Sequence, residues 1–114
     1  MVDRSQWLRG VTELLVLAVL QPRASYGYEL VERLSALGID DLSEATVYGT
    51  LRRLEAQGLL VSRLAASQSG PARRYYEVTT KGTRWRRETA MEWSAFVSTV
   101  DRIVVTAERK RGAS

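Results

Sequence analysis

Apolar residues recur at spacings of three and four in the first half of the chain, which is the spacing of amphipathic helices. The pattern predicts helices over approximately residues 5–20, 26–37 and 43–57. Gln21-Pro22 ends the first helix, and Ser25 and Ser43 are N-cap candidates for the second and third. The buried face of the third helix is expected to comprise Val47, Leu51 and Leu54.

The pattern changes to a period of two after these helices, which predicts a β-hairpin over about residues 59–79. The segment between its two arms, AASQSGPA, has the composition of a loop. Alternation places Tyr76 and Val78 on the inner face of the hairpin. The second and third helices alone fit either a helix-turn-helix or a helical hairpin of a small bundle, and the β-hairpin favours the first. This order is typical of a winged helix-turn-helix, whose second helix of the pair enters the DNA major groove.

A helical pattern returns over about residues 81–108 and is followed by a short basic tail, 109–114. Its apolar residues form a seam that is wider than so small a domain can cover by itself. The seam comprises Trp93, Phe96, Val97, Val100, Ile103, Val104 and Ala107. We therefore expect residues 1–80 to be a DNA-binding domain and 81–108 to be a dimerisation helix that pairs with a second copy. The predicted fold class is mainly α with a small β-hairpin.

The composition narrows the range of functions. With 114 residues, 45% of them hydrophobic, the chain is long enough for one modest core. It has no cysteine and no histidine, which removes disulfides, the commonest metal ligand and the commonest general base. No catalytic or phosphate-loop motif is present, so we expect neither an enzyme nor a cofactor or metal site. The longest apolar run, Leu14–Leu20, is too short to span a membrane, and a cytoplasmic location is expected.

Double-stranded DNA is the partner that the charged and small residues favour, and the net charge of +4 agrees with an anionic partner. On the third helix, small side chains let the backbone approach base edges, and a threonine offers both a hydroxyl and a methyl group. Arginines at the point where the wing turns back suit phosphate oxygens or a narrow minor groove. The candidates are Ser43, Thr46, Tyr48, Gly49, Arg52, Arg53, Arg73 and Arg74. Alternatively, the wing arginines are only solvated, and Tyr48 belongs to the edge of the core.

Four segments, in this order and spacing, resemble the PadR family of bacterial winged-helix transcriptional regulators. They cover about residues 9–82 and read RGVTELLVLAVL, YGYELVERL, SEATVYGTLRRLEAQGLL and RRYYEVTTKG. The resemblance implies a homodimer, joined through a single C-terminal helix as in the short-tailed branch, that represses transcription by binding a pseudo-palindromic operator. Gly49 stands where the family usually has proline, which leaves open the base contacts at this position.

The resemblance also implies a ligand site. Short members of the family that respond to planar hydrophobic compounds bind them in a cavity at the dimer interface, beside an aromatic residue on the last helix. Trp93 stands in the matching place, and Trp7, Phe96 and Val100 are the other candidates for contact with a small hydrophobic effector. The alternative is that Trp93 only holds the dimer together.

A function of another class is also compatible with the sequence: a winged helix that binds an acidic protein through its basic wing and has no sequence-specific DNA site. The two hypotheses predict a different salt dependence of DNA binding and a different preference among DNA sequences. RNA binding has no aromatic stacking platform in the sequence to support it.

Overall fold

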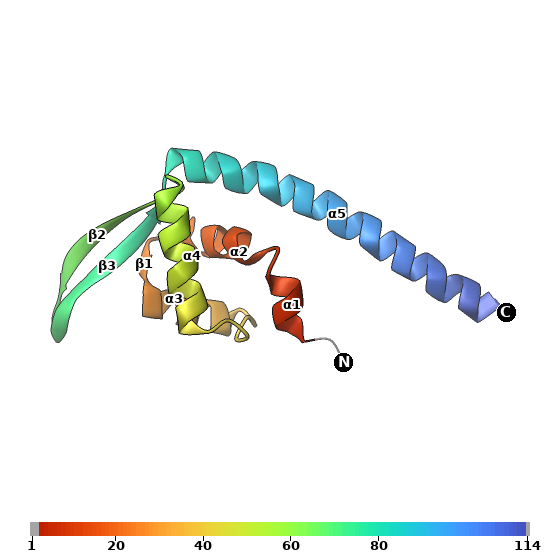
Figure 1. The fold of residues 1–114 in the computed structure, drawn as a ribbon, viewed down its shortest axis with the longest axis horizontal. Helices are drawn as coiled ribbons and strands as arrows, with labels where there is room; N and C mark the ends of the chain where they lie inside the picture. The colour runs from red at the N-terminus through yellow and green to blue at the C-terminus, as the bar shows by residue number, and fades with distance from the viewer. Residues whose placement is uncertain (1–2, 114) are drawn as a thin grey trace.

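The computed structural model describes residues 3–113 (Figure 1). Its elements follow one another as α1 (Arg4–Leu8), α2 (Thr12–Leu20), β1 (Ser25–Tyr26), α3 (Gly27–Ala36), α4 (Glu44–Ala56), β2 (Leu60–Ser67), β3 (Gly70–Val78) and α5 (Thr80–Ala113). The predicted fold class is confirmed, because a mainly helical chain carries a small antiparallel sheet and ends in one long helix. Residues 1, 2 and 114, which the sequence assigned to the first domain and the basic tail, lie outside the described residues. Within residues 3–113, no helix is both long and apolar enough to cross a membrane.

The single helix predicted over 5–20 is wrong, because residues 9–11 separate α1 from α2. Gly10 lies at this break, and a glycine inside a helix costs about 1 kcal/mol relative to alanine. The Thr12 hydroxyl donates to the carbonyl oxygen of Leu8 over 2.6 Å across the break. The side chains around the break form a small apolar cluster apart from the main core, made of Leu8, Val11 and Leu14.

The sheet has three antiparallel strands in the order β1-β3-β2, one strand more than the predicted hairpin. The hairpin begins with the pair Leu60 and Val78 at its base. The additional strand, β1, has two residues and pairs Tyr26 with Tyr75 of β3. A strand of two residues is too short to show a period, so the sequence pattern could not reveal it.

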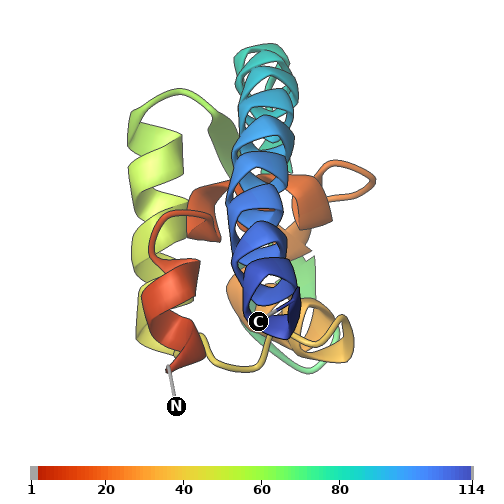
Figure 2. The same ribbon diagram turned by 90° about the vertical axis from the view of Figure 1, so that its right-hand side faces the viewer.

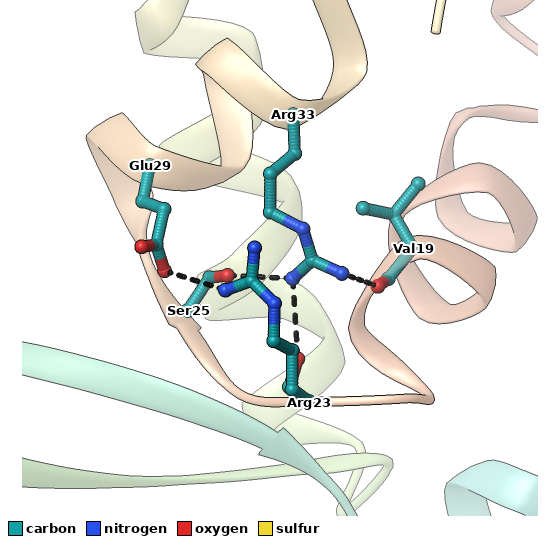
Figure 3. Close-up of polar contacts among 5 residues, drawn as sticks. All are labelled: Val19, Arg23, Ser25, Glu29 and Arg33. Carbon is teal, nitrogen blue, oxygen red and sulfur yellow. Dashed lines mark hydrogen bonds and ion pairs between the residues drawn. The ribbon is translucent and has the colours of Figure 1, made fainter. Parts of the chain in front are cut away.

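Ser25 lies in this additional strand and not at a helix N-cap, so its predicted role is wrong. Its side chain is buried, and the hydroxyl accepts a hydrogen bond from Arg33 Nη1 over 2.6 Å (Figure 3). The same guanidinium donates to the carbonyl oxygens of Arg23 and Val19, and Arg23 Nη1 lies 3.4 Å from Glu29 Oε1. Partial burial, and then the charge of Arg23, lowers the pKa of Arg33, which stays protonated at neutral pH. One side chain of α3 therefore ties together α2, β1 and the loop between them.

Leucine and valine side chains from α2, α3 and α4 form the main core, which the base of the sheet closes with Leu60 and Tyr76. The predicted apolar line of the third helix is confirmed, since Val47, Leu51 and Leu54 of α4 are fully buried. Tyr76 faces inward, as the alternation predicted. The elements from α2 to β3 form a winged helix-turn-helix head, with α3 and α4 as the helix pair and β2 and β3 as the wing (Figure 1).

Helix α5 starts at the base of the wing and extends well beyond the other elements (Figure 1), and Figure 2 views the molecule from the side of its C-terminal end. Gly82 lies so close to the carbonyl oxygen of Leu59 that any side chain at position 82 would collide with it. Arg86 Nε donates to Gln21 Oε1 over 2.7 Å, which ties the start of α5 to the end of α2. The helix continues to Ala113, past the predicted end at residue 108 and into the predicted tail. Basic residues favour this continuation, because they are stabilised near the C-terminal end of a helix dipole.

Candidate nucleic-acid interface and apolar groove

Helix α4 begins where the sequence predicted, at an N-cap formed by Ser43. The Ser43 hydroxyl accepts a hydrogen bond from the backbone N–H of Thr46 over 3.1 Å and lies 2.9 Å from the Thr46 hydroxyl. This cap satisfies an N–H group that the first turn of a helix would otherwise leave without a partner. Ser43 and Thr46 are both exposed, so two hydroxyl groups lie at the surface of this helix end.

The face of α4 opposite the core carries small side chains except at Arg52. Ala45, Arg52 and Ala56 are exposed there, and Gly49 is half-buried. The helix is continuous through Gly49, and a methyl group at this position would meet only Arg53 Nη1, at 3.8 Å. Since small residues leave the backbone thinly covered, this face can approach another surface closely.

Arg53 lies on the flank of α4 that faces α2, and its neighbours hold it there. Arg53 Nε lies 3.5 Å from Glu13 Oε1, and Nη2 donates to the Thr50 hydroxyl over 3.3 Å. Thr46, Arg53 and Asp41 line a polar groove of about 350 Å³ on this side of the helix. A contact between Arg53, one of the DNA-binding candidates, and DNA would therefore compete with an ion pair or be added to it.

Tyr48 lies on the opposite flank of α4, which faces the wing. Its ring covers Gly27, where any side chain would collide with it, and it also packs against the main core. Of the two alternatives that the sequence left open for Tyr48, the ring occupies the core edge, and a DNA contact of Tyr48 stays a prediction. Tyr48 also lines a second groove, of about 340 Å³, between α4 and the wing.

Arg73 and Arg74 lie within strand β3, so their predicted position at the turn of the wing is wrong. The turn is formed by residues 68 and 69, because the hairpin arms are longer than the aromatic and β-branched segments that predicted them. Neighbouring residues in a strand point to opposite faces of the sheet. Arg74 Nη1 donates to the Ser62 hydroxyl over 3.1 Å, and this hydroxyl donates to Glu55 of α4. Arg74 therefore lies on the sheet face toward α4.

The opposite face of the sheet carries a row of alternating arginine and tyrosine side chains. Arg73 Cζ lies 4.4 Å from the centroid of the Tyr26 ring, and Arg63 Cζ lies 5.5 Å from the centroid of the Tyr75 ring. The two tyrosine rings meet edge to face with centroids 5.4 Å apart. Neither Tyr26 nor Arg63 is a sequence candidate, because the pairing of β1 with β3 places Tyr26 in this row and the pairing of β2 with β3 places Arg63 there.

A largely apolar groove of about 490 Å³ lies between α1 and α5. All four residues predicted to contact an effector line it, although α1 and α5 are distant in the sequence. They are Trp7, Trp93, Phe96 and Val100. Leu8, Val11, Val97 and Val104 add further apolar lining, and Arg4 and Asp101 are its charged members. The sequence pattern missed the contribution of Leu8 and Val11, because it did not predict the break that separates α1 from α2.

The predicted seam of α5 is exposed in the structure. Trp93 is 41% exposed, Phe96 61% and Ile103 62%, and all the other seam residues are also exposed. Contiguous apolar surface of this kind is rare on a monomeric protein and is typical of an interaction surface. Among the described residues, no group of three or more acidic side chains is placed to hold a metal ion.

Residues 16–88 match the transcriptional regulator PadR-like family, over a segment that runs from within α2 to the start of α5. The chain belongs to the PadR family of transcriptional regulators. A padR family transcriptional regulator from Eggerthella lenta is 36% identical, with a TM-score of 0.80 over 88% of this chain and 87% of that one. A PadR-like transcriptional regulator from Bacillus cereus is 34% identical, with a TM-score of 0.78 over 87% of this chain and 96% of that one.

A curated relative, an uncharacterized protein of Lysinibacillus sphaericus, is 27% identical over 100 residues, which are 86% of this chain and 92% of that protein. The PadR match extends from α2 into the start of α5 and so contains every DNA-binding candidate. Trp7 and Trp93 lie outside it. The family match therefore covers most of the head and none of the residues that line the apolar groove.

Proposed function

We propose that this PadR protein is a homodimeric repressor that binds a pseudo-palindromic operator with α4 and the wing of each protomer. The arrangement of the head carries the proposal, because a capped helix with a thinly covered face lies between two grooves that contain arginines. In complexes of this class, the recognition helix contacts base edges from its N-terminal part, and arginines contact phosphates.

Each candidate has a role in this proposal. Ser43, Thr46 and Gly49, in the first half of α4, approach the base edges, and their small size allows close contact. The arginines bind phosphates, and Tyr48 supports the helix against α3. The phosphate-binding set is Arg52, Arg53, Arg73 and Arg74.

The exposed seam of α5 supports a dimer. A helix of 34 residues that leaves the head carries apolar side chains which the protomer itself does not cover. A two-fold symmetric pair would cover both seams and present two copies of α4 about 34 Å apart, which is one turn of DNA. This spacing predicts an operator with two related half-sites.

Selection of binding duplexes from a random DNA pool tests the operator. We expect an enriched pseudo-palindrome with half-site centres about 10 base pairs apart, and a steep fall of affinity with salt. Replacing both Thr46 and Arg53 with alanine should reduce the preference for this sequence over random duplex. An unchanged preference would oppose the groove-binding role of α4, and no enriched sequence at all would favour the protein-interaction alternative.

Sedimentation of two matched variants tests the dimer. Val100→Glu places a charge in the seam, whereas Val105→Glu places the same charge on the other side of α5, at a residue of similar exposure, 42% against 40%. We expect Val100→Glu to be a monomer that no longer binds the operator, and Val105→Glu to remain a dimer. A dimeric Val100→Glu variant would overturn the proposed interface.

The groove between α1 and α5 supports an effector role. A planar hydrophobic compound between Trp7 and Trp93 would change how α5 lies against the head, and thereby the spacing of the two copies of α4. Titration of planar compounds should quench tryptophan emission and change operator affinity together, and Trp93→Ala should weaken both effects. Quenching without any change of operator affinity would contradict this regulation.

A further inference from the structure

The groove between the wing and α4 differs in charge from the groove on the other side of the helix. Its lining comprises Tyr26, Gly27, Tyr48, Ala72, Arg73, Arg74 and Tyr76, with two arginines and no carboxylate. The groove toward α2 includes Asp41 in its lining, and its Arg53 is paired with Glu13. The wing-side groove is therefore the one whose chemistry suits an anion.

We propose that this groove binds one phosphate of the DNA backbone, and that Tyr26 is a positioning residue that holds Arg73 for this contact. The inference rests on the proposed function, since it takes DNA as the partner. It assigns to Tyr26 a role that acts through Arg73 and involves no base.

The geometry of Arg73 supports this assignment. Its Cζ lies 4.4 Å from the centroid of the Tyr26 ring, a distance at which a guanidinium is attracted to the face of an aromatic ring. One face of the planar group is thus occupied, while the N–H donors at its edges remain directed outward in the plane. Within the described residues, Arg73 takes part in no ion pair, so its charge is available to an anion.

Tyr26 is itself fixed by contacts on several sides. It pairs with Tyr75 in the sheet, and the two rings meet edge to face. The preceding residue, Ser25, is buried and accepts the hydrogen bond from Arg33 that is drawn in Figure 3. The support under Arg73 is therefore anchored in the core of the head, which reduces the freedom that Arg73 would lose on binding DNA.

A phosphate suits this position better than a base. The groove meets α4 only at Tyr48, on the flank toward the wing and not on the face of Ala45 and Gly49, and the DNA backbone borders the major groove into which such a helix inserts. The sheet residues that line the groove come only from β1 and β3, so the groove follows the edge of β3 that the short β1 leaves open. Arg74 from the sheet face toward α4 and Arg73 from the opposite face both line it at this edge, and the fork of N–H donors on each guanidinium matches phosphate oxygens. Contacts of this kind fix the register of the protein on DNA and carry no sequence information directly.

Salt titration of DNA affinity tests the phosphate contact. Arg73→Ala should weaken binding to the selected operator and to random duplex by the same factor. It should also lower the slope of log K against log salt by about 0.9 for each head, or about 1.8 for a dimer. A loss confined to the operator would show that Arg73 reads sequence and would overturn the phosphate assignment. Arg63→Ala is the control, since it removes the other stacked arginine of the same sheet face but not one that lines the groove.

A double-mutant cycle tests the role of Tyr26. Tyr26→Leu should weaken binding by about two- to fivefold for each head, the worth of an exposed cation–π contact. Tyr26→Phe, which keeps the ring and the fold, should bind as the wild type does. In the Arg73→Ala background, Tyr26→Leu should have no further effect, because its role acts through Arg73.

The possible outcomes separate this inference from the proposed function. The positioning role of Tyr26 would be overturned if Tyr26→Leu lowered DNA affinity equally in the wild-type and Arg73→Ala backgrounds, or if Tyr26→Phe lowered it. Operator binding would stand in either case. A loss from Arg63→Ala equal to that from Arg73→Ala would show that the charge of the sheet acts generally and that the groove is not the site. Absence of DNA binding by the wild type would overturn both proposals.

Discussion

The junction between the head and α5 depends on Gly82. A Cβ atom at this position would collide with the carbonyl oxygen of Leu59, and would lie 3.0 Å from the carbonyl carbon of Leu59 and 2.9 Å from Val78 Cγ1. Carbon atoms are most stable at separations of about 3.5–4.0 Å, so in Gly82→Ala the helix and the base of the wing must move apart by more than about 0.5 Å. The backbone carbonyl of Leu59 cannot rotate away as a side chain would, because it accepts a hydrogen bond from the N–H of Thr79.

The change in the free energy of unfolding caused by Gly82→Ala has two opposing contributions. Alanine is favoured over glycine inside a helix by about 1 kcal/mol, whereas overpacking of a close contact costs about 1–3 kcal/mol. We expect the collision to dominate in Gly82→Ala and to lower the free energy of unfolding by about 1–2 kcal/mol. Gly49→Ala is the matched control, since its new methyl group would meet only Arg53 Nη1 at 3.8 Å. It should raise the free energy of unfolding by up to about 1 kcal/mol.

Urea unfolding followed by circular dichroism measures both variants, at one fixed protomer concentration because association would add to the apparent stability. The two variants should move the urea midpoint in opposite directions. A Gly82→Ala protein as stable as the wild type would refute the reasoning, since it would mean that α5 can shift away from Leu59 at no cost. Because α5 is about 51 Å long at 1.5 Å per residue, a tilt of about 5° at Gly82 would move its far end by about 4 Å. Operator affinity should therefore fall further than the loss of stability alone explains.

Three other substitutions test the interactions that hold the head together. Ser43→Ala removes the cap of α4 and should lower the free energy of unfolding by about 1 kcal/mol, whereas Ser43→Gly should cost only a few tenths. Arg33→Ala leaves the buried Ser25 hydroxyl without its donor and should cost about 1–3 kcal/mol in urea unfolding, and an unaffected midpoint would show that the network in Figure 3 is dispensable. Burial, and then the charge of Glu55, raises the pKa of Tyr76 above its ordinary value of 10.0. As the pH rises, the unfolded chain therefore loses the Tyr76 proton before the folded chain does. The stability that the neutral phenol contributes is complete below pH 10 and is lost as the pH rises through the folded-state pKa. Urea titrations at alkaline pH should show that stability falls less steeply with pH in Tyr76→Phe than in the wild type.

Local patterns account for the features that the sequence predicted correctly. The Ser43 hydroxyl accepts a hydrogen bond from a backbone N–H only three residues further on, and the line of Val47, Leu51 and Leu54 follows from the helical repeat alone. The inward position of Tyr76 follows from the alternation of a strand in the same way. Each of these features depends on residues that are close in the sequence, so the pattern determines them before any tertiary contact forms.

The features that the sequence did not predict depend on contacts between segments that are distant in the chain. Strand β1 exists because Ser25 and Tyr26 pair with β3, some 50 residues further along the chain, and the row of arginines and tyrosines depends on that pairing. The groove that unites Trp7 with Trp93 depends on how α5 lies against α1, which Gly82 and the contact between Arg86 and Gln21 help to set. The sequence by itself determined that the chain has helices, a wing and an apolar seam, although not the break between α1 and α2 or the turn of the wing, because period and capping are local properties. Only the tertiary structure decided which further side chains line the grooves, such as Leu8, Val11 and Tyr26, because packing between elements that are distant in the chain fixes their positions.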